Sequence, residues 1–340
     1  MAKTVDSAFN EFMRDFVNLS PTRVSNARNS RDAMFDRINA LKDFLPLDKV
    51  HHMQFGSFAR KTKIRPIDDI DLIISLKSSD FEIICNGSWD DYKLKLKNTQ
   101  SEFFDFCDRD YSGYAYIFST YYLNSTKIKN FLKNRLEKLY DCAKAELHSK
   151  GEAVTLKFRS YEWNFDIVPA FYIEATAYSE EYYLIPNKFG GWKKTNPKID
   201  RDRVKDINSE CNGKAVELVR LAKYWNRRHT MPSMPSYLIE AIVLNFCKSK
   251  NYSIRFIDCN FRDLLSYISQ NIFSYIDDPK GIQGNINSIS YEQKYAIATR
   301  AKNDYTKASS AVSAEIYEKN QEKAIKLWRE ILGGDFPTYG

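Results

Sequence analysis

The sequence contains few residues that interrupt regular structure, with only 12 glycines and 10 prolines among 340 residues. This low content excludes a collagen-like chain and does not indicate disorder. No apolar run approaches the roughly 18 residues that a membrane-spanning helix needs. Residues 1–6 lack the apolar core of a signal peptide. We therefore expect a globular protein that is neither embedded in a membrane nor secreted.

Cysteine and histidine are also scarce, with six and four residues. No two cysteines form a C-x-x-C pair and none has a histidine at ligand spacing, so a structural zinc site is not indicated. Scattered thiols are typical of a reduced, cytoplasmic protein. Lysine and arginine exceed aspartate and glutamate by seven. This modest excess fits an anionic partner, either nucleotides or nucleic acid, without distinguishing between them.

The spacing of apolar residues predicts helices at both ends of the chain. Two amphipathic stretches, 4–19 and 21–45, form a long bent element in which Ser20 is the N-cap and Pro21 begins the second helix. Further helices are expected over 90–106 and 127–147. The C-terminal part is predicted to be entirely helical, with candidate helices over 214–228, 236–248, 261–270, 290–310 and 311–332.

Period-two alternation predicts strands in the middle of the chain, most clearly over 69–76. Residues 154–159 and 162–168 are expected to form a hairpin, followed by irregular chain to residue 205. The order of helices, mixed sheet and helices indicates an α+β protein. We predict a catalytic core over residues 1–205 and a helical domain over residues 206–340.

The strongest chemical signal is a Gly56-Ser57 pair that precedes Asp69-Ile70-Asp71. Two aspartates two positions apart on a strand share a face, with Cα atoms about 6.6 Å apart. Such carboxylates suit hard divalent ions, while Gly56 allows close approach of the backbone to a phosphate and Ser57 offers a hydroxyl. The alternative is that the two aspartates merely cap a strand.

A third carboxylate, Asp166, lies in the alternating segment Trp163–Pro169. If this strand neighbours the strand of Asp69 and Asp71, three carboxylates converge, and three can hold the two metal ions of an in-line displacement at phosphorus. Taken alone, Asp166 is better explained as a strand-edge residue before a proline. The prediction therefore depends on which strands are neighbours.

These segments resemble the nucleotidyltransferase fold of the DNA polymerase β superfamily. More narrowly, they are similar to the bacterial cGAS/DncV-like nucleotidyltransferases, which are related to oligoadenylate synthetase. The resemblance implies an α+β, polymerase β-like core with a mixed sheet and an oligoadenylate synthetase-like, all-helical C-terminal domain. It also implies a bilobed molecule with a central cleft.

Two segments of the C-terminal half extend the resemblance. Leu221–Asn226 is similar to the family helix whose lysine reaches the triphosphate, which here would be Lys223. In the segment that begins at Pro235, Ser236 would contact phosphate and Tyr237 would stack on a base. Independently of the family, a serine at a helix N-terminus favours an anion. The alternative is that Tyr237 is a core aromatic residue and Lys223 a solvated surface charge.

The resemblance implies an enzyme that joins two or more ribonucleoside triphosphates into a cyclic di- or oligonucleotide and releases pyrophosphate. Asp69, Asp71 and Asp166 would hold two Mg²⁺ ions, with Mn²⁺ as an alternative. The product would act on an effector in bacterial antiphage defence. An accessory protein would join the C-terminal Gly340 to targets, and nucleic acid would not be required, because no zinc-binding His and Cys insertion is present.

Two other functions fit the same residues. One is a template-independent nucleotidyltransferase that acts on an RNA end or a protein. The other is a nucleotide- or RNA-binding protein on an inactive nucleotidyltransferase scaffold, which three intact carboxylates disfavour.

Overall fold

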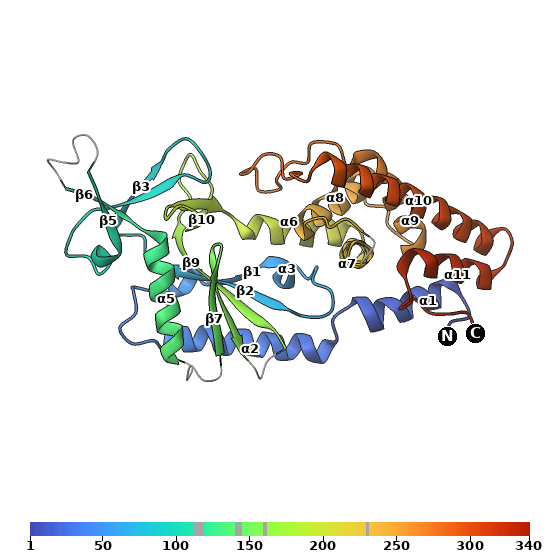
Figure 1. Cartoon of the computed structure of the whole chain (residues 1–340), viewed down its shortest axis with the longest axis horizontal. Coiled ribbons are helices and arrows are strands. Elements are labelled where there is room, and N and C mark those ends of the chain that lie inside the picture. Colours follow the sequence, from blue (N-terminus) through green and yellow to red (C-terminus); the bar gives the residue numbers. More distant parts are fainter. Residues whose placement is uncertain (112–118, 140–144, 159–161, 229–230) are drawn as a thin grey trace. The chain divides into compact units, whose positions relative to one another are not determined.

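A computed structural model describes residues 1–111, 119–139, 145–158, 162–228 and 231–340. The chain folds into two compact units (Figure 1). The helical unit comprises Met1–Pro21, Arg60–Pro66 and Ile199–Gly340, and the sheet unit comprises Thr22–Ala59 and Ile67–Lys198. These units differ from the predicted segments 1–205 and 206–340, because the helical unit also takes in the N-terminal residues and a short segment around residue 63.

An eleven-stranded mixed sheet forms the framework of the sheet unit among the described residues. Its main path runs β1-β2-β9-β10-β11-β4-β6-β5, while β3 pairs with β4, and β8 pairs with β7 and β9. The strands are β1 Met53–Phe55, β2 Asp69–Leu76, β3 Phe81–Cys85, β4 Tyr92–Leu96, β5 Cys107–Asp110, β6 Thr120–Leu123, β7 Ala145–Lys150, β8 Ala153–Phe158, β9 Asn164–Ile173, β10 Tyr182–Pro186 and β11 Trp192–Thr195.

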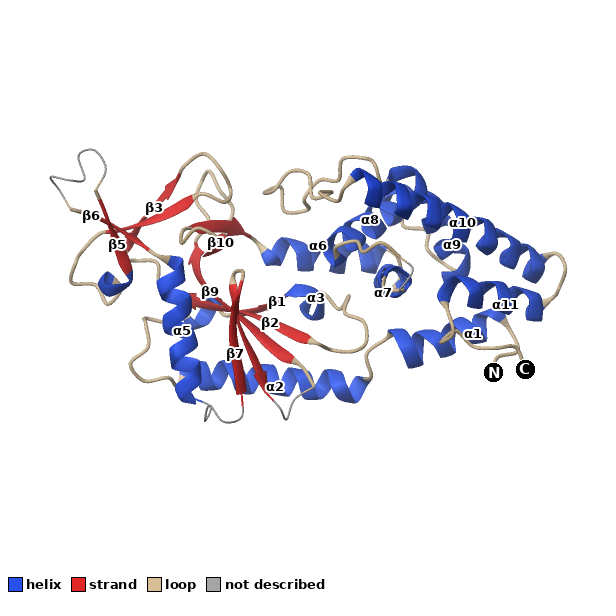
Figure 2. Ribbon diagram, in the orientation of Figure 1, coloured by secondary structure: helices blue, strands red, loops and turns tan. Residues whose placement is uncertain are grey.

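Helices accompany this sheet in the same unit (Figure 2). They are α2 Pro21–Asn39, the single turn α3 Gly56–Ala59 and α5 Ser125–Leu139, with short 3₁₀ turns over Lys49–His51 and Phe104–Phe106. α5 exists because Ile128, Leu132 and Leu136 recur at helical spacing and are all buried. A core between the strands centres on Phe171 and Trp192, whose ring centroids lie 5.0 Å apart.

The helical unit packs around one large apolar core. Its helices are α1 Val5–Phe12, the π-helical turn Met13–Val17, α6 Pro197–Glu210, α7 Lys214–Asn226, α8 Ser236–Ser249, α9 Ile257–Asn271, α10 Tyr291–Ile316 and α11 Gln321–Leu332. Phe9 of α1 lies edge-on to Trp328 of α11, with ring centroids 5.0 Å apart. Contacts of this kind place the N-terminal helix in the helical unit rather than with the sheet.

Several predicted elements need correction. Residues 90–106 are not a helix, because Tyr92–Leu96 alternates with period two and forms β4. The region 169–205 is not irregular, since it contains the end of β9, all of β10 and β11, and the start of α6. The helix expected over 127–147 ends at Leu139, and β7 begins at Ala145. Residues 140–144 lie outside the described residues.

The overall architecture is α+β, as predicted, with a mixed sheet followed by a helical C-terminal region. Within the described parts of the chain, no helix is both long enough and apolar enough to cross a bilayer. The five cysteines in these parts are free thiols, and Cys142 lies outside them.

Candidate active site

Two parallel strands bring the three predicted carboxylates to neighbouring positions. β2 and β9 pair in a register that sets Asp71 beside Asp166 and Asp69 beside Asn164. Neighbouring strands lie about 4.8 Å apart, and residues two apart on a strand share a face. The three aspartates therefore lie on one face of the sheet, and each is half-buried. The condition on which the sequence argument depended, that these two strands are neighbours, is met.

Gly56 lies directly against the Asp71 carboxylate. It follows β1, which is antiparallel to β2 with Phe55 opposite Asp71, and its backbone has a φ of +72°. A Cβ built on Gly56 would lie 1.7 Å from Oδ2 of Asp71, far inside van der Waals contact. Only glycine fits this position, because it both tolerates the positive φ and leaves room for the carboxylate. Ser57 comes next, in α3.

Sequence reasoning missed a hydroxyl that fixes the third aspartate. Thr155 of β8 is the register partner of Asp166, and its Oγ1 donates a 2.6 Å hydrogen bond to Oδ1 of Asp166. The alternation of β8 places Thr155 between buried Val154 and Leu156. Once β8 and β9 are recognised as a hairpin, that pattern predicts a polar residue on the same face as Asp166. It does not predict the hydrogen bond between Thr155 and Asp166.

The donor atoms of this site fit a hard divalent cation. Three carboxylates offer the oxygen ligands that Mg²⁺ prefers, and the Asp71 carboxylate lies in the place that a Cβ of residue 56 would take, so glycine is what allows it to stand there. Within residues 1–111, 119–139, 145–158, 162–228 and 231–340, no group of three or more His, Cys, Asp or Glu side chains is already arranged to hold a metal ion.

Lys223, in the helical unit, is buried rather than solvated. Its side chain is 5% exposed, and Nζ lies 2.6 Å from Oε1 of Glu240, which is 3% exposed. Nζ also donates to the carbonyl oxygen and hydroxyl of Thr62, at 3.1 and 3.3 Å. Burial lowers the pKa of Lys223 despite the neighbouring carboxylate. Burial opposes ionisation of Glu240, but Arg60 and Lys223 hold its pKa below the ordinary value.

Tyr237 is held by charged groups of the same unit. Its hydroxyl donates to Asp200 at 2.6 Å and contacts Asp278 at 3.0 Å. Lys280 donates to that hydroxyl at 2.7 Å, and its Nζ lies 4.3 Å from the ring centroid. Burial, followed by the charge of Asp200, raises the pKa of Tyr237. Ser236 is exposed at the first position of α8.

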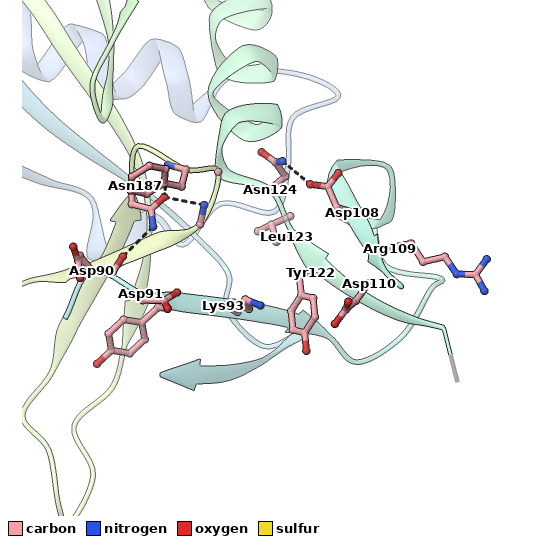
Figure 3. Close-up of a pocket in the computed structure, with 14 residues that line it drawn as sticks. Asp90, Asp91, Lys93, Asp108, Arg109, Asp110, Tyr122, Leu123, Asn124 and Asn187 are labelled. Carbon is pink, nitrogen blue, oxygen red and sulfur yellow. Dashed lines mark hydrogen bonds between the residues drawn. The ribbon is translucent and has the colours of Figure 1, made fainter. Parts of the chain in front are cut away.

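The sheet unit also contains a separate polar cavity of about 540 Å³ (Figure 3). It lies over β4, β5, β6 and the β10–β11 turn, and it contains none of the predicted site residues. Asp108 at its edge accepts a 2.6 Å hydrogen bond from Asn124 and pairs with Lys127 at 2.9 Å. In the strand order these strands are separated from β2 by β9, β10 and β11, so the cavity is distinct from the aspartates.

The structure thus gathers the predicted site residues into two groups. Gly56, Ser57, Asp69, Asp71 and Asp166 belong to the sheet unit. Lys223, Ser236 and Tyr237 belong to the helical unit, on α7 and α8. In the helical group, Arg60, Glu240, Asp200, Asp278 and Lys280 were not predicted. Their partners are remote in sequence, so no local pattern indicates them.

Comparison with known proteins gives consistent matches. Residues 3–113 match the family model described as the Second Messenger Oligonucleotide or Dinucleotide Synthetase domain. The chain is 34% identical over 352 residues to a probable cyclic nucleotide synthase of Bacillus cereus (strain VD146), covering 100% of this chain and 99% of that protein. It is 27% identical over 210 residues to a cyclic AMP-AMP-AMP synthase of Acinetobacter sp. (strain ATCC 27244 / 9458), covering 58% of this chain and 57% of that protein.

Two solved structures of E. coli MS115-1 CdnC resemble the chain over its whole length. The CdnC:HORMA-deltaN complex aligns with a TM-score of 0.67 at 18% identity. CdnC with ATP aligns with a TM-score of 0.68 at 17% identity, and each alignment covers 98% of both chains. At these identities the likeness bears on the fold alone. It confirms the predicted combination of a mixed-sheet core and a helical C-terminal domain.

Proposed function

The chain belongs to the cGAS/DncV-like nucleotidyltransferases, and from this membership we propose that it synthesises a cyclic di- or oligonucleotide from ribonucleoside triphosphates. The relatives named as cyclic nucleotide and cyclic AMP-AMP-AMP synthases support this activity. The observation that carries the proposal is the register of β2 and β9, in which Asp71 lies beside Asp166 on the face that also bears Asp69.

The proposed reaction is attack by the ribose hydroxyl of one nucleotide on the α-phosphate of another, with loss of pyrophosphate. Asp69, Asp71 and Asp166 hold the reacting groups on one face of the sheet. Mg²⁺ or Mn²⁺ bound by these carboxylates would lower the pKa of the attacking hydroxyl and neutralise charge on the triphosphate. Thr155 keeps Asp166 oriented toward that face through its 2.6 Å bond. A second round of the same chemistry closes the ring.

Further residues are proposed to bind the nucleotide. The backbone at Gly56 and the hydroxyl of Ser57 would contact phosphate, as would Ser236 at the start of α8, while Tyr237 would stack on a base. Lys223 is also proposed to contact phosphate, but its amino group is already bonded within the protein. All three N–H donors of a lysine are used here by Thr62 and Glu240, so Lys223 would have to exchange a partner to reach a phosphate.

The proposed biological setting follows from the family. The cyclic product would activate an effector in bacterial antiphage defence, in the cytoplasm, and nucleic acid would not be needed. A protein partner is proposed because a related fold is known as the CdnC:HORMA-deltaN complex. An accessory protein that joins Gly340 to targets is part of the same proposal. The residues before it are anchored, since Phe336 is fully buried and the carbonyl of Thr338 accepts a 2.9 Å hydrogen bond from Ala2.

Incubation with Mg²⁺ and all four labelled ribonucleoside triphosphates tests the activity, with mass spectrometry of any phosphatase-resistant product. We expect Asp71→Asn and Asp166→Asn to lower product formation by at least about 100-fold. Asp68→Asn is a matched control, because Asp68 adjoins the motif but its side chain is exposed. Dependence of the reaction on added RNA or protein would favour the template-independent transferase. Unchanged activity in the Asp71→Asn and Asp166→Asn variants would reject the assigned site.

A further inference from the structure

The segment Arg60–Pro66, here called the strap, lies in the sequence between α3 and the residues that precede β2. Although both of these belong to the sheet unit, the strap belongs to the helical unit. In the chain it separates the Gly56-Ser57 pair from Asp69 and Asp71, so it is covalently continuous with both parts of the proposed phosphate and metal motif. Thr62 of the strap is fully buried, and Ile64 packs against the core of the helical unit. The strap is therefore an anchored segment rather than a loose loop.

Glu240 of α8 is the centre of that anchoring. Its carboxylate accepts two hydrogen bonds from Arg60, at 2.8 Å from Nε and 3.1 Å from Nη2. The same carboxylate pairs with Lys223 at 2.6 Å, and Lys223 in turn donates to Thr62. One acidic group thus joins the strap to α7 and α8, directly through Arg60 and indirectly through Lys223.

Two arginines secure the remainder of the strap through backbone carbonyls. Arg220 of α7 donates twice to the carbonyl of Lys61, at 2.9 and 2.6 Å, where Lys61 has a φ of +61°. Arg65 donates to the carbonyl of Arg14 at 3.0 Å, and its own N–H donates to Val17 at 3.1 Å. These bonds fix the path of the strap, but the charge balance of the buried cluster depends on Glu240.

We propose that Glu240 is a positioning residue, which fixes the strap and through it the placement of the Gly56-Ser57 turn beside Asp71. The inference rests on the proposed function, since it concerns the geometry of the same site. Arg60 and Lys223 are 11% and 5% exposed, and Glu240 is 3% exposed. Removing the carboxylate leaves two buried cations uncompensated. The least costly response is for Arg60 to turn toward water, which releases the strap from α8.

Glu240→Gln tests this with a side chain of equal size and no charge. Asp304→Asn is the matched control, because Asp304 is also a buried carboxylate of the helical unit, 2% exposed, and accepts 2.8 Å bonds from Arg300 and Trp225 away from the strap. Arg60→Met is a second variant that breaks only the strap side of the pair and leaves Glu240 bonded to Lys223. It keeps the test valid if Glu240→Gln does not fold.

Two measurements separate positioning from general stability. Limited trypsin digestion with peptide mapping reports cleavage after Lys61 and Lys63, the two strap sites that every variant retains. Steady-state kinetics of product formation reports kcat and KM below the melting temperature of each variant. We expect Glu240→Gln and Arg60→Met to raise strap cleavage by about tenfold and to lower kcat by about 10–100-fold, with KM changed less than about threefold. Asp304→Asn should do neither.

The outcomes distinguish this inference from the proposed function. The inference would be overturned if Glu240→Gln and Arg60→Met gave the same strap cleavage and the same kcat as Asp304→Asn. The comparison is made between variants with equal loss of melting temperature. Absence of any cyclic product from the wild-type protein would reject the proposed function instead. In that case the digestion comparison still decides whether Glu240 anchors the strap.

Discussion

Replacing Gly56 by alanine should lower the activity far more than a matched glycine replacement of equal backbone cost, and this contrast follows from the geometry. A Cβ at this position would lie 1.7 Å from Oδ2, 2.6 Å from Cγ and 3.1 Å from Cβ of Asp71. The first two atoms are at the end of a side chain that can rotate away. In the Gly56→Ala variant the clash would be relieved by rotation of the Asp71 carboxylate, which is the group that the proposed reaction needs.

The stability cost has a separate origin and can be measured separately. An alanine in the left-handed region costs about 1–2 kcal/mol, and Gly56 has a φ of +72°. Gly87 has a φ of +88°, and a Cβ there would meet nothing within 4 Å. Gly87→Ala therefore carries the backbone cost without the clash. Both variants should lower the melting temperature by about 2–8 °C.

Product formation from labelled nucleotides then separates the two variants. We expect Gly56→Ala to lose at least about 100-fold in rate, because the displaced carboxylate is a proposed metal ligand, whereas Gly87→Ala stays within about twofold of wild type. Similar rates in the two alanine variants would refute the reasoning, since they would show that the position of Asp71 beside Gly56 is not needed for the reaction.

Three further predictions concern partners of the site and of the sheet. Thr155→Val removes the hydroxyl that donates to Asp166 at 2.6 Å and should lower kcat by about 5–10-fold, equivalent to about 1 kcal/mol; Thr155→Ser should restore the rate, and equal rates in the two variants would reject an orienting role. Tyr237→Phe should lower the free energy of unfolding by about 1–3 kcal/mol, because it removes the bond to Asp200. If the ring stacks on a base, this variant should leave the nucleotide KM unchanged while Tyr237→Leu raises it; a KM that Tyr237→Leu leaves unaltered argues against stacking. Burial lowers the pKa of His52 from 6.5 to about 4, so the unfolded state binds the proton more readily and stability is lost as pH falls from 6.5 to 4. The loss in the free energy of unfolding is about 1–2 kcal/mol after allowance for partial solvent screening. Urea titrations at several pH values should show a smaller loss in His52→Gln than in the wild-type protein. Identical pH profiles for the two proteins would contradict the role of His52.

The elements that could be predicted from sequence are those with a clear local period. Residues 69–76 alternate strictly and coincide with β2, and α7 and α8 begin at the residues expected. β9 was predicted to end before Pro169, yet it continues to Ile173. The proline is tolerated because β8 pairs with residues 164–167 and β10 with residues 171–173. It therefore lies where the strand changes partner on that side.

The turns between strands were harder to predict than the strands themselves. Gly190 and Gly191 lie in the stretch before residue 205 that was expected to be irregular, whereas they belong to the turn that joins β10 to β11. Gly190 supplies a φ of +82°, and Asn187 donates a 3.0 Å backbone hydrogen bond to Gly191. Side-chain pairs that are remote in the sequence could not be predicted from local patterns. Arg60 and Glu240, for example, are 180 residues apart.

Burial restricts the register of β2 and β9 once the two strands are known to be neighbours. Ile70 and Leu72 flank Asp71, Phe165 precedes Asp166, and these three apolar side chains are all at most 1% exposed. A slip of one residue would move every side chain of one strand to the opposite face and bury its aspartates, at several kcal/mol for each unpaired charge. Only even shifts keep the apolar residues inside. The hydrophobic alternation that protects the core therefore also keeps the three carboxylates on one face.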